Sequence, residues 1–303
     1  MSKVPVVAVV GATAAGKTSL SLDLARALGG EVVNTDAMQV YRGMDIGTAK
    51  LPESERAGVP HHLLDLLEVT EPASVAEFQT LARGVVHDLR SRGATPVLVG
   101  GSALYTRAVL DRFEFPGTDP TLRARLEDEC AQVGAAAMHA RLATVDPQAA
   151  AGIEPANSRR IVRALEVVEL TGRPFSATLP VLEYALDSAV QIGVDIDRPT
   201  LDARIETRVQ QMFADGFVAE VEALLARGLA RGRTAGRAIG YAEVTAHLAG
   251  ELTREEAVER TVIATRRFSR RQDAWFRKDP RIVWVPFDAP DRLEQALAAV
   301  RAV

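Results

Sequence analysis

Residues 11–18, with the sequence GATAAGKT, constrain the fold of this chain more than any other segment. They fit the phosphate-binding pattern G-x-x-x-x-G-K-[ST]. The apolar, β-branched run at 6–10 precedes them and predicts a buried parallel strand. Residues 19–28 follow with apolar side chains at helical spacing. A strand, a glycine-rich loop and a helix in this order are the context in which such a loop binds phosphate.

The loop predicts a diphosphate site. Its backbone N–H groups turn inward around an anion, and the N-terminus of the following helix adds positive potential. Lys17 is expected to reach the terminal phosphate, and the hydroxyl of Thr18 to bind Mg²⁺. The expected diphosphate-binding residues are Gly11, Ala12, Thr13, Ala14, Ala15, Gly16, Lys17 and Thr18. The alternative is a glycine turn with a coincidental lysine, and the flanking elements argue against it.

Composition narrows the class of protein. A chain of 303 residues with 47% apolar side chains can form one large domain or two smaller ones. The single cysteine, Cys130, excludes an intramolecular disulfide and a thiolate zinc cluster. No apolar run approaches the length of a membrane span, and the apolar N-terminal stretch indicates a core strand rather than a signal peptide. We therefore expect a cytoplasmic protein without membrane partners.

Charge alone does not indicate a nucleic-acid partner, because the net charge is −4. Its distribution is more informative, since only four of the 36 basic residues are lysines and the arginines are clustered. Such clusters can bind phosphate groups, although a solvated helix face explains any single cluster equally well. The clusters are Arg159, Arg160 and Arg163; Arg227, Arg231, Arg233 and Arg237; and Arg260, Arg266, Arg267, Arg270, Arg271 and Arg277.

Strand and helix patterns alternate at both ends of the chain, which predicts an α/β fold with a parallel sheet. Besides 6–10, strands are expected at 31–34, 60–65, 95–99, 191–196 and 282–285. Helices are expected at 19–28, 75–92, from 102, at 199–227, 241–248 and 253–278, and from 292.

The middle of the chain contains only helical patterns, at 121–133, 135–144 and 157–171. A helical segment of this length is within the range of small domains. The sequence therefore predicts three parts: the first part of the α/β core at 1–114, a helical insertion at 115–187, and the completion of the core with C-terminal helices at 188–303.

Asp36 directly follows the second predicted strand. The carboxyl ends of parallel strands are where such sheets bind their ligands. From its position alone, Asp36 could be a metal ligand, a general base or a helix cap.

Residues 36–50, DAMQVYRGMDIGTAK, are the most specific motif of the chain. Together with the phosphate loop and 98–105, LVGGSALY, they resemble the tRNA dimethylallyltransferase family. Similar segments extend over the whole chain, at 157–167, 212–222, 239–241 and 265–277. The resemblance implies a P-loop NTPase-like parallel sheet flanked by helices, with an inserted all-helical subdomain that binds tRNA. It also implies a transferase that moves a dimethylallyl group from its diphosphate to N6 of the adenosine 3′ of the tRNA anticodon, releasing diphosphate.

The resemblance assigns catalytic roles. Asp36 would accept the N6 proton, and Thr13 would donate a hydrogen bond to the bridging oxygen of the diphosphate. Lys17 and Mg²⁺ would stabilise the charge on the leaving group. Arg237 would be a second cation on the diphosphate.

The resemblance also implies RNA contacts, and a monomer with tRNA and dimethylallyl diphosphate as partners. The target adenine must leave its stack to reach the electrophile. The expected tRNA-binding residues are Asp36, Ala37, Met38, Gln39, Ser102, Arg123, Arg159, Arg160, Ile161, Val162 and Arg163. The segment 159–163 would grip the anticodon stem-loop through its phosphates. Ala15 and Ala37 stand where the family usually has serine, and Ala37 removes a hydroxyl beside the expected base.

Two other functions share these features. A small-molecule or nucleotide kinase would use the same loop with Mg²⁺ and ATP. Against it, the chain offers no clear acidic partner for Mg²⁺ at a strand end beyond Asp36. A nucleotide-binding switch or RNA-binding module without catalysis is the other alternative, and Asp36 beside Lys17 and Thr18 argues against it.

Overall fold

The computed structural model describes residues 4–178 and 182–303. The chain divides into two compact units. The first consists of Met1–Leu110 and Leu186–Val303, and the second of Asp111–Ala185. The second unit therefore begins four residues before the predicted start of the insertion at 115, and ends two residues before its predicted end at 187.

A six-stranded sheet in the order β3-β2-β4-β1-β5-β6 forms the centre of the first unit. Every pairing in it is parallel, which confirms the predicted α/β class. Its central strand β1 is buried along its whole length, as expected for a strand covered on both faces. The strands are β1 (Val6–Val10), β2 (Gly30–Asn34), β3 (His61–His62), β4 (Thr95–Val99), β5 (Ala189–Asp195) and β6 (Ile282–Pro286).

Strand β3 is shorter than the predicted 60–65. Leu63 and Asp65 have φ angles of 64° and 56°, in the left-handed region. Residues in that region cannot continue an extended strand, so pairing with β2 ends at His62.

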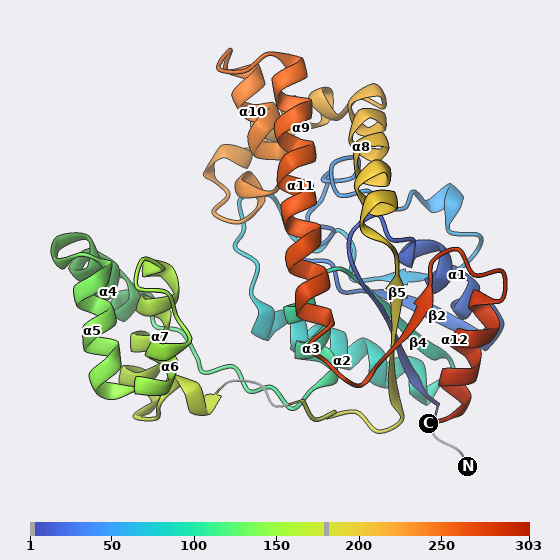
Figure 1. The fold of residues 1–303 in the computed structure, drawn as a ribbon, viewed down its shortest axis with the longest axis horizontal. Helices are drawn as coiled ribbons and strands as arrows, with labels where there is room; N and C mark the ends of the chain where they lie inside the picture. The colour runs from blue at the N-terminus through green and yellow to red at the C-terminus, as the bar shows by residue number, and fades with distance from the viewer. Residues whose placement is uncertain (1–3, 179–181) are drawn as a thin grey trace. The chain divides into compact units, whose positions relative to one another are not determined.

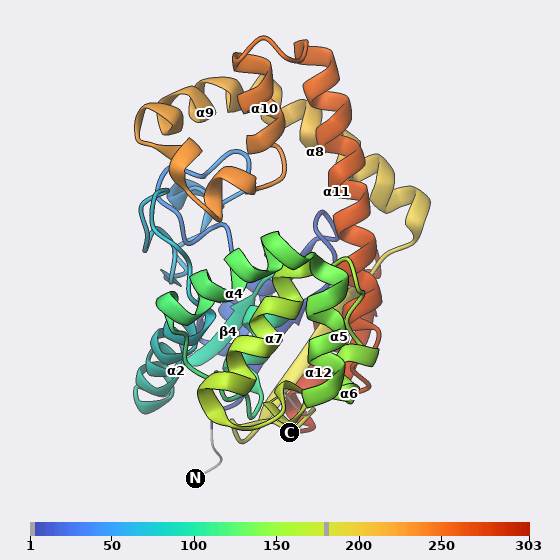
Figure 2. The ribbon, with the colours of Figure 1, turned by 90° about the vertical axis from the view of Figure 1, so that its left-hand side faces the viewer.

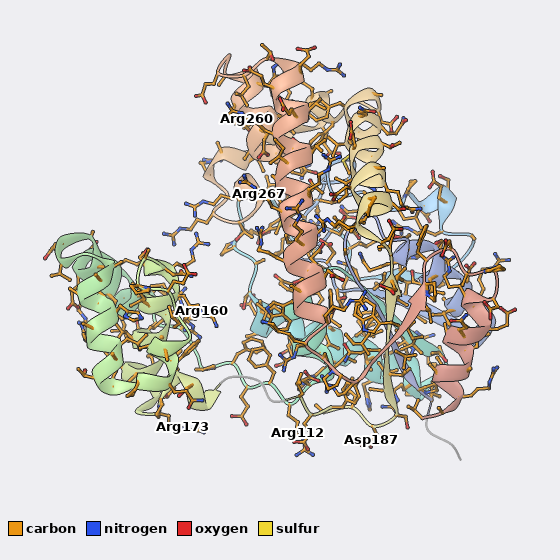
Figure 3. The ribbon with its side chains drawn as sticks, viewed as in Figure 1. Arg112, Arg160, Arg173, Asp187, Arg260 and Arg267 are labelled. Carbon is orange, nitrogen blue, oxygen red and sulfur yellow. The ribbon has the colours of Figure 1, made fainter. Side chains whose placement is uncertain are left out.

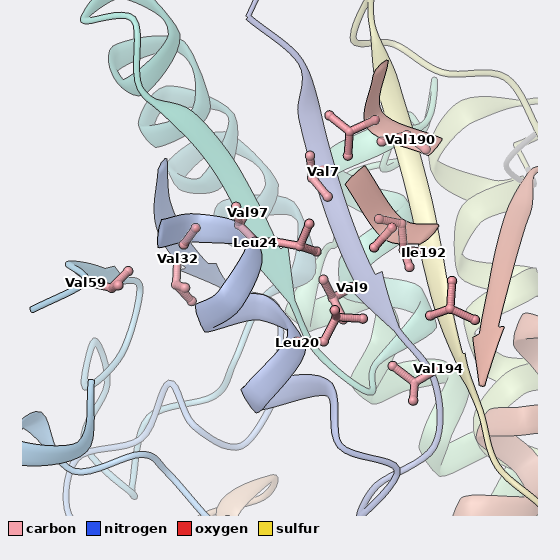
Figure 4. Packing of buried hydrophobic residues seen from close by; sticks show 14 of the residues in the cluster. Val7, Val9, Leu20, Leu24, Val32, Val59, Val97, Val190, Ile192 and Val194 are labelled. Atoms are coloured by element: carbon pink, nitrogen blue, oxygen red, sulfur yellow. The ribbon is translucent and has the colours of Figure 1, made fainter. Parts of the chain in front are cut away.

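Helices cover both faces of this sheet (Figure 1). Helices α1 (Lys17–Leu28) and α12 (Arg292–Arg301) pack on one face, where Leu20 and Leu24 meet valines of the central strands (Figure 4). Helices α2 (Val75–Ser91) and α3 (Ala103–Leu110) cover the other face. Ser74 begins α2 by accepting a hydrogen bond from the N–H of Glu77.

Four helices gather where β5 ends, beyond the carboxyl edge of the sheet (Figure 1). They are α8 (Arg198–Ala214), α9 (Phe217–Ala226), α10 (Tyr241–Leu248) and α11 (Arg254–Phe276). The prediction of a single helix at 199–227 is wrong, because the helix is interrupted at Gly216. That residue has a φ of 100°, in the left-handed region that glycine adopts without strain.

The second unit is helical (Figure 2). It has its own hydrophobic core. Its helices are α4 (Pro120–Val133), α5 (Ala135–Val145), α6 (Pro147–Ala151) and α7 (Ser158–Thr171). Helix α6 was not expected from the sequence. Asp146 caps it by accepting a hydrogen bond from the N–H of Ala149, and proline stands at its first position.

The remaining regular elements are short 3₁₀ turns. They are η1 (Glu53–Glu55), η2 (Phe175–Thr178), η3 (Leu229–Arg231) and η4 (Ala235–Arg237). Within the described parts of the chain, no helix has the length and apolarity needed to cross a membrane.

Candidate active site

The phosphate loop connects β1 to α1 in a conformation that depends on glycine. Gly11 has a φ of 134°, and a Cβ atom there would lie 3.2 Å from the carbonyl oxygen of Val194. Gly16, with a φ of 103°, begins α1, and no side chain caps this helix end. The first N–H groups of α1 are therefore open to an anion. Ala15 is fully buried in the core, so its side chain takes no part in the site.

Lys17 is a partly buried cation of the loop. Its Nζ donates a hydrogen bond to the carbonyl oxygen of Ala12 at 2.7 Å. Burial, and secondarily the positive charge of Arg208, lower the pKa of Lys17 to about 8, against the opposing effect of Asp36. An anion bound in the loop would reverse these effects and favour the charged ammonium.

Asp36 is held in one orientation by its own neighbours. Its backbone N–H donates to Oδ1 of Asn34 at 2.8 Å. Its Oδ1 accepts hydrogen bonds from the N–H groups of Met38 at 2.8 Å and Gln39 at 3.4 Å. Its Oδ2 accepts none from the described residues. One carboxylate oxygen thus fixes the side chain, and the other is left for a ligand.

A pocket of about 70 Å³ brings together three of the predicted catalytic residues, Thr13, Lys17 and Asp36. The phosphate loop contributes Thr13, Lys17 and Thr18 to its wall, and the end of β2 contributes Asp36. Its other lining residues are Ser21, Gln39, Thr48, Ala49, Leu51, His61, Leu64, Val99, Gly100, Gly101 and Arg208. The loop and the candidate base therefore face one small space.

Arg208 of α8 also lines this pocket, although it was not predicted from the sequence. Burial, followed by the charge of Arg204, lowers the pKa of Arg208. It makes no hydrogen bond to another described residue, whereas Arg204 donates to the carbonyl oxygen of Ala14 at 2.8 Å. A desolvated guanidinium without a partner is suited to bind phosphate oxygens. The available signal was the spacing of Arg204 and Arg208, four residues apart on one predicted helix.

A larger neighbouring pocket, of about 770 Å³, shares Arg208 and Ala49 with the first. Ala14, Arg204 and Met212 are among its lining residues. The arginine pair of α8 thus lies between the phosphate loop and an adjoining open space.

Arg237, the predicted second cation, lies on η4 with an exposed side chain. It lines neither of these two pockets. Of the two arginines, Arg208 therefore lines the pocket with the phosphate loop, and the role of Arg237 on the diphosphate stays a prediction.

The residues predicted to contact RNA in the first unit lie next to Asp36 or at the start of α3. Ala37, Met38 and Gln39 are half-buried, and Nε2 of Gln39 donates to the carbonyl oxygen of Thr48 at 3.1 Å. Oγ of Ser102 accepts the N–H of Tyr105 at 3.5 Å at the start of α3. Only Gln39 of these residues lines the pocket with Asp36.

The predicted RNA contacts of the helical unit need correction. Ile161 and Val162 are 0% and 4% exposed and belong to the core of this unit, so their side chains cannot contact RNA. Arg163 donates to Glu166 at 2.8 Å and to the carbonyl oxygen of Pro116 at 2.7 Å.

Arg123, on α4, also bonds Glu166, with Nε 3.1 Å from Oε2. Glu166 is fully buried. Burial raises its pKa, but the hydrogen bonds from Arg123 and Arg163 outweigh this effect, so the pKa lies below its usual value. Both arginines therefore neutralise a buried charge. Arg159 and Arg160 are exposed, and Figure 3 shows Arg160 at the surface of α7.

Glu220 of α9 is another residue that sequence reasoning missed. It accepts hydrogen bonds from the N–H groups of Asp45 at 3.1 Å, Ile46 at 2.6 Å and Gly47 at 3.2 Å. It also accepts the hydroxyl of Tyr241 at 2.6 Å, and burial together with Glu220 raises the pKa of Tyr241. The carboxylate therefore holds the loop that leads to Thr48 and Ala49 at the pocket wall.

Lys50, at the end of the same motif, has a structural role. Its Nζ lies 2.6 Å from a carboxylate oxygen of both Asp45 and Asp65, and its side chain is 4% exposed. The lysine of the DIGTAK sequence thus fixes the motif internally and does not reach the phosphate loop pocket.

The chain is similar to known proteins of one family. Residues 39–279 match the family described as IPP transferase. The tRNA dimethylallyltransferase of Nocardioides sp. is 68% identical over 301 residues, covering 99% of this chain and 97% of that protein.

Two solved structures are similar over most of their length. The tRNA isopentenylpyrophosphate transferase of Bacillus halodurans has a TM-score of 0.71 and 40% identity, covering 99% of this chain and 95% of that one. A eukaryotic dimethylallyltransferase acting on tRNA has a TM-score of 0.81 and 26% identity, covering 93% of this chain and 74% of that one.

Proposed function

The chain belongs to the IPP transferase family, and we propose that it transfers a dimethylallyl group from dimethylallyl diphosphate to N6 of the adenosine 3′ of the anticodon in tRNA, releasing diphosphate. The observation that supports this most strongly is the shared pocket of Thr13, Lys17, Thr18, Asp36 and Arg208. It places anion-binding groups and one oriented carboxylate around a single small space. A transfer from a diphosphate to an amine requires both.

The phosphate loop serves the leaving group. When the C–O bond to the dimethylallyl carbon breaks, negative charge grows on the bridging oxygen of the diphosphate. The open N–H groups of α1, the ammonium of Lys17 and the guanidinium of Arg208 stabilise that charge. Thr13, which lines the same pocket, donates its hydroxyl to the bridging oxygen.

Asp36 acts as the base for the nucleophile. The N6 amine forms a bond to the dimethylallyl carbon and must lose one proton. Oδ2 of Asp36 accepts that proton, while Oδ1 stays bonded to the N–H groups of Met38 and Gln39. The backbone bonds keep the carboxylate in one orientation while the proton is transferred.

The donor set fits a Mg²⁺ ion that brings most of its ligands from the substrate. No cluster of three or more His, Cys, Asp or Glu side chains that could hold a metal occurs among the described residues. Thr18 and Asp36 nevertheless line one pocket, and Mg²⁺ commonly takes one or two protein oxygens with phosphate oxygens and waters. Thr18 would hold the ion, with Asp36 facing it. The ion would supply Lewis-acid stabilisation of the diphosphate.

The partners and compartment follow the same proposal. The substrates are tRNA and dimethylallyl diphosphate, and the enzyme acts as a monomer in the cytoplasm. The one cysteine, Cys130, is free and buried in the helical unit, which suits a reducing compartment.

A labelled-substrate assay separates this activity from phosphoryl transfer. The protein is incubated with tRNA and either dimethylallyl diphosphate carrying label in its C5 unit or ATP labelled in its γ-phosphate. We expect label from dimethylallyl diphosphate to enter tRNA, and no tRNA-dependent release or transfer of phosphate from ATP. Phosphate transfer from ATP without prenyl transfer would identify a kinase and refute the proposal.

A further inference from the structure

Gln272 lies on α11, far from the phosphate loop in sequence, but its side chain is bonded to that loop. Its Oε1 accepts a hydrogen bond from the N–H of Thr13 at 2.9 Å. Its Nε2 donates to the carbonyl oxygen of Gly101 at 2.8 Å. The residue is 6% exposed. One buried amide therefore joins the phosphate loop, the connection from β4 to α3, and α11.

The neighbouring backbone is shaped to admit this amide. A Cβ atom at Gly101 would lie 2.2 Å from Nε2 of Gln272, so a side chain there would displace the amide from this position. Thr13 and Gly101 both line the pocket that contains Lys17 and Asp36. The two hydrogen bonds of Gln272 are therefore made at the wall of the proposed active site.

We propose that Gln272 is a positioning residue for the transfer reaction, acting through Thr13. Its bond to the Thr13 N–H fixes that peptide, and with it the direction of the side chain that meets the diphosphate. This inference rests on the proposed function for the identity of the substrate. The surroundings select an amide, because one side of the group must accept a hydrogen bond and the other must donate one.

Two substitutions test the two halves of the amide. Gln272→Met keeps the length of the side chain but removes both strong hydrogen bonds. Gln272→Glu keeps an acceptor for Thr13 but places a carboxylate oxygen against the Gly101 carbonyl oxygen, and adds negative charge beside the diphosphate. Gln148→Met, at an exposed glutamine of α6, is the matched control.

The measurements are kcat for transfer and the Kd of inorganic pyrophosphate by calorimetry. We expect Gln272→Met to lower kcat by about 10–100-fold, by analogy with the loss of an outer-shell hydrogen-bond partner of a metal ligand. We expect it to weaken pyrophosphate binding about tenfold, since a site less well ordered beforehand binds its ligand less tightly. Gln272→Glu should lower kcat and weaken pyrophosphate binding more than Gln272→Met does. The KM for tRNA should be unchanged, and the control should equal wild type.

A double-mutant cycle with Thr13→Ala separates positioning from a merely structural role. If Gln272 acts through Thr13, Gln272→Met should lower kcat by less than about threefold in the Thr13→Ala background. Additive effects on kcat, or a lowered Tm with kcat and pyrophosphate affinity unchanged, would overturn the inference. A wild-type protein that transfers no dimethylallyl group would refute the proposed function alone, because the pyrophosphate titration reports on Gln272 independently.

Discussion

Lys17 shows how a single side chain can couple binding to protonation. Burial and Arg208 lower its pKa to about 8, so the amine is partly neutral near that pH in the free protein. A bound diphosphate favours the charged form and raises the pKa. The side chain must therefore take up a proton when the ligand binds near pH 8.

We expect calorimetric titrations of pyrophosphate at pH 8, in buffers of different ionisation enthalpy, to show net proton uptake by the protein. The part of the uptake due to Lys17 is the difference between wild type and Lys17→Met at pH 8, which separates the lysine from ionisation of pyrophosphate itself. This difference should vanish at pH 6, where Lys17 is already charged. Equal proton uptake in wild type and Lys17→Met would contradict the assignment.

Arg208 and Arg237 form a matched pair for testing which arginine meets the diphosphate. Arg208 is desolvated and lines the pocket, whereas Arg237 is exposed and does not. We expect Arg208→Ala to lower kcat by ~10²–10³, as for other donors to a developing oxyanion, and Arg237→Ala to affect the diphosphate step less than about threefold. Steady-state kinetics with varied dimethylallyl diphosphate decide between them, and the reverse order would restore the prediction from sequence.

At the scale of elements, α7 places neighbouring arginines in two different environments. Arg163 turns inward to the buried Glu166, whereas Arg160 lies at the surface. The sequence favours one RNA-binding role for the whole 159–163 segment, but the helix distributes these residues around its circumference.

We expect Arg163→Ala to destabilise the protein by about 1–3 kcal/mol, because Glu166 stays buried with one partner fewer. Arg160→Ala should leave stability unchanged but weaken tRNA binding and reduce its dependence on salt by about 0.7–0.9 log units for each phosphate that is no longer neutralised. Thermal melts and tRNA titrations at several salt concentrations measure both. Loss of stability in Arg160→Ala with unaltered RNA binding would contradict the division of roles.

The elements also show what could be predicted from sequence. Strands such as β1 and β4 are apolar runs buried on both sides, so their composition identifies them. The break at Gly216 was missed because helical spacing continues on either side of it. Arg208 was missed because an arginine on a helix is most often solvated, and only the fold shows that α8 turns it into the pocket.

At the scale of the molecule, we propose different tasks for the two units. The first contains the sheet, the phosphate loop and Asp36, and the second is a helical unit with its own core. All the pocket residues come from the first unit, so the chemistry is assigned to it. We propose that the exposed arginines of the second unit bind RNA.

The proposed activity requires that the pocket formed by the phosphate loop and Asp36 attach a dimethylallyl group to N6 of adenosine. The most direct test is nucleoside mass spectrometry of an anticodon stem-loop RNA incubated with dimethylallyl diphosphate and either wild type or Asp36→Asn. We expect wild type to add one C5H8 unit to N6 of the adenosine 3′ of the anticodon. Asp36→Asn should bind both substrates but form this product ~10²–10⁴ times more slowly. An unmodified N6 with wild type would contradict the proposed activity, and equal rates with both proteins would contradict the role of Asp36.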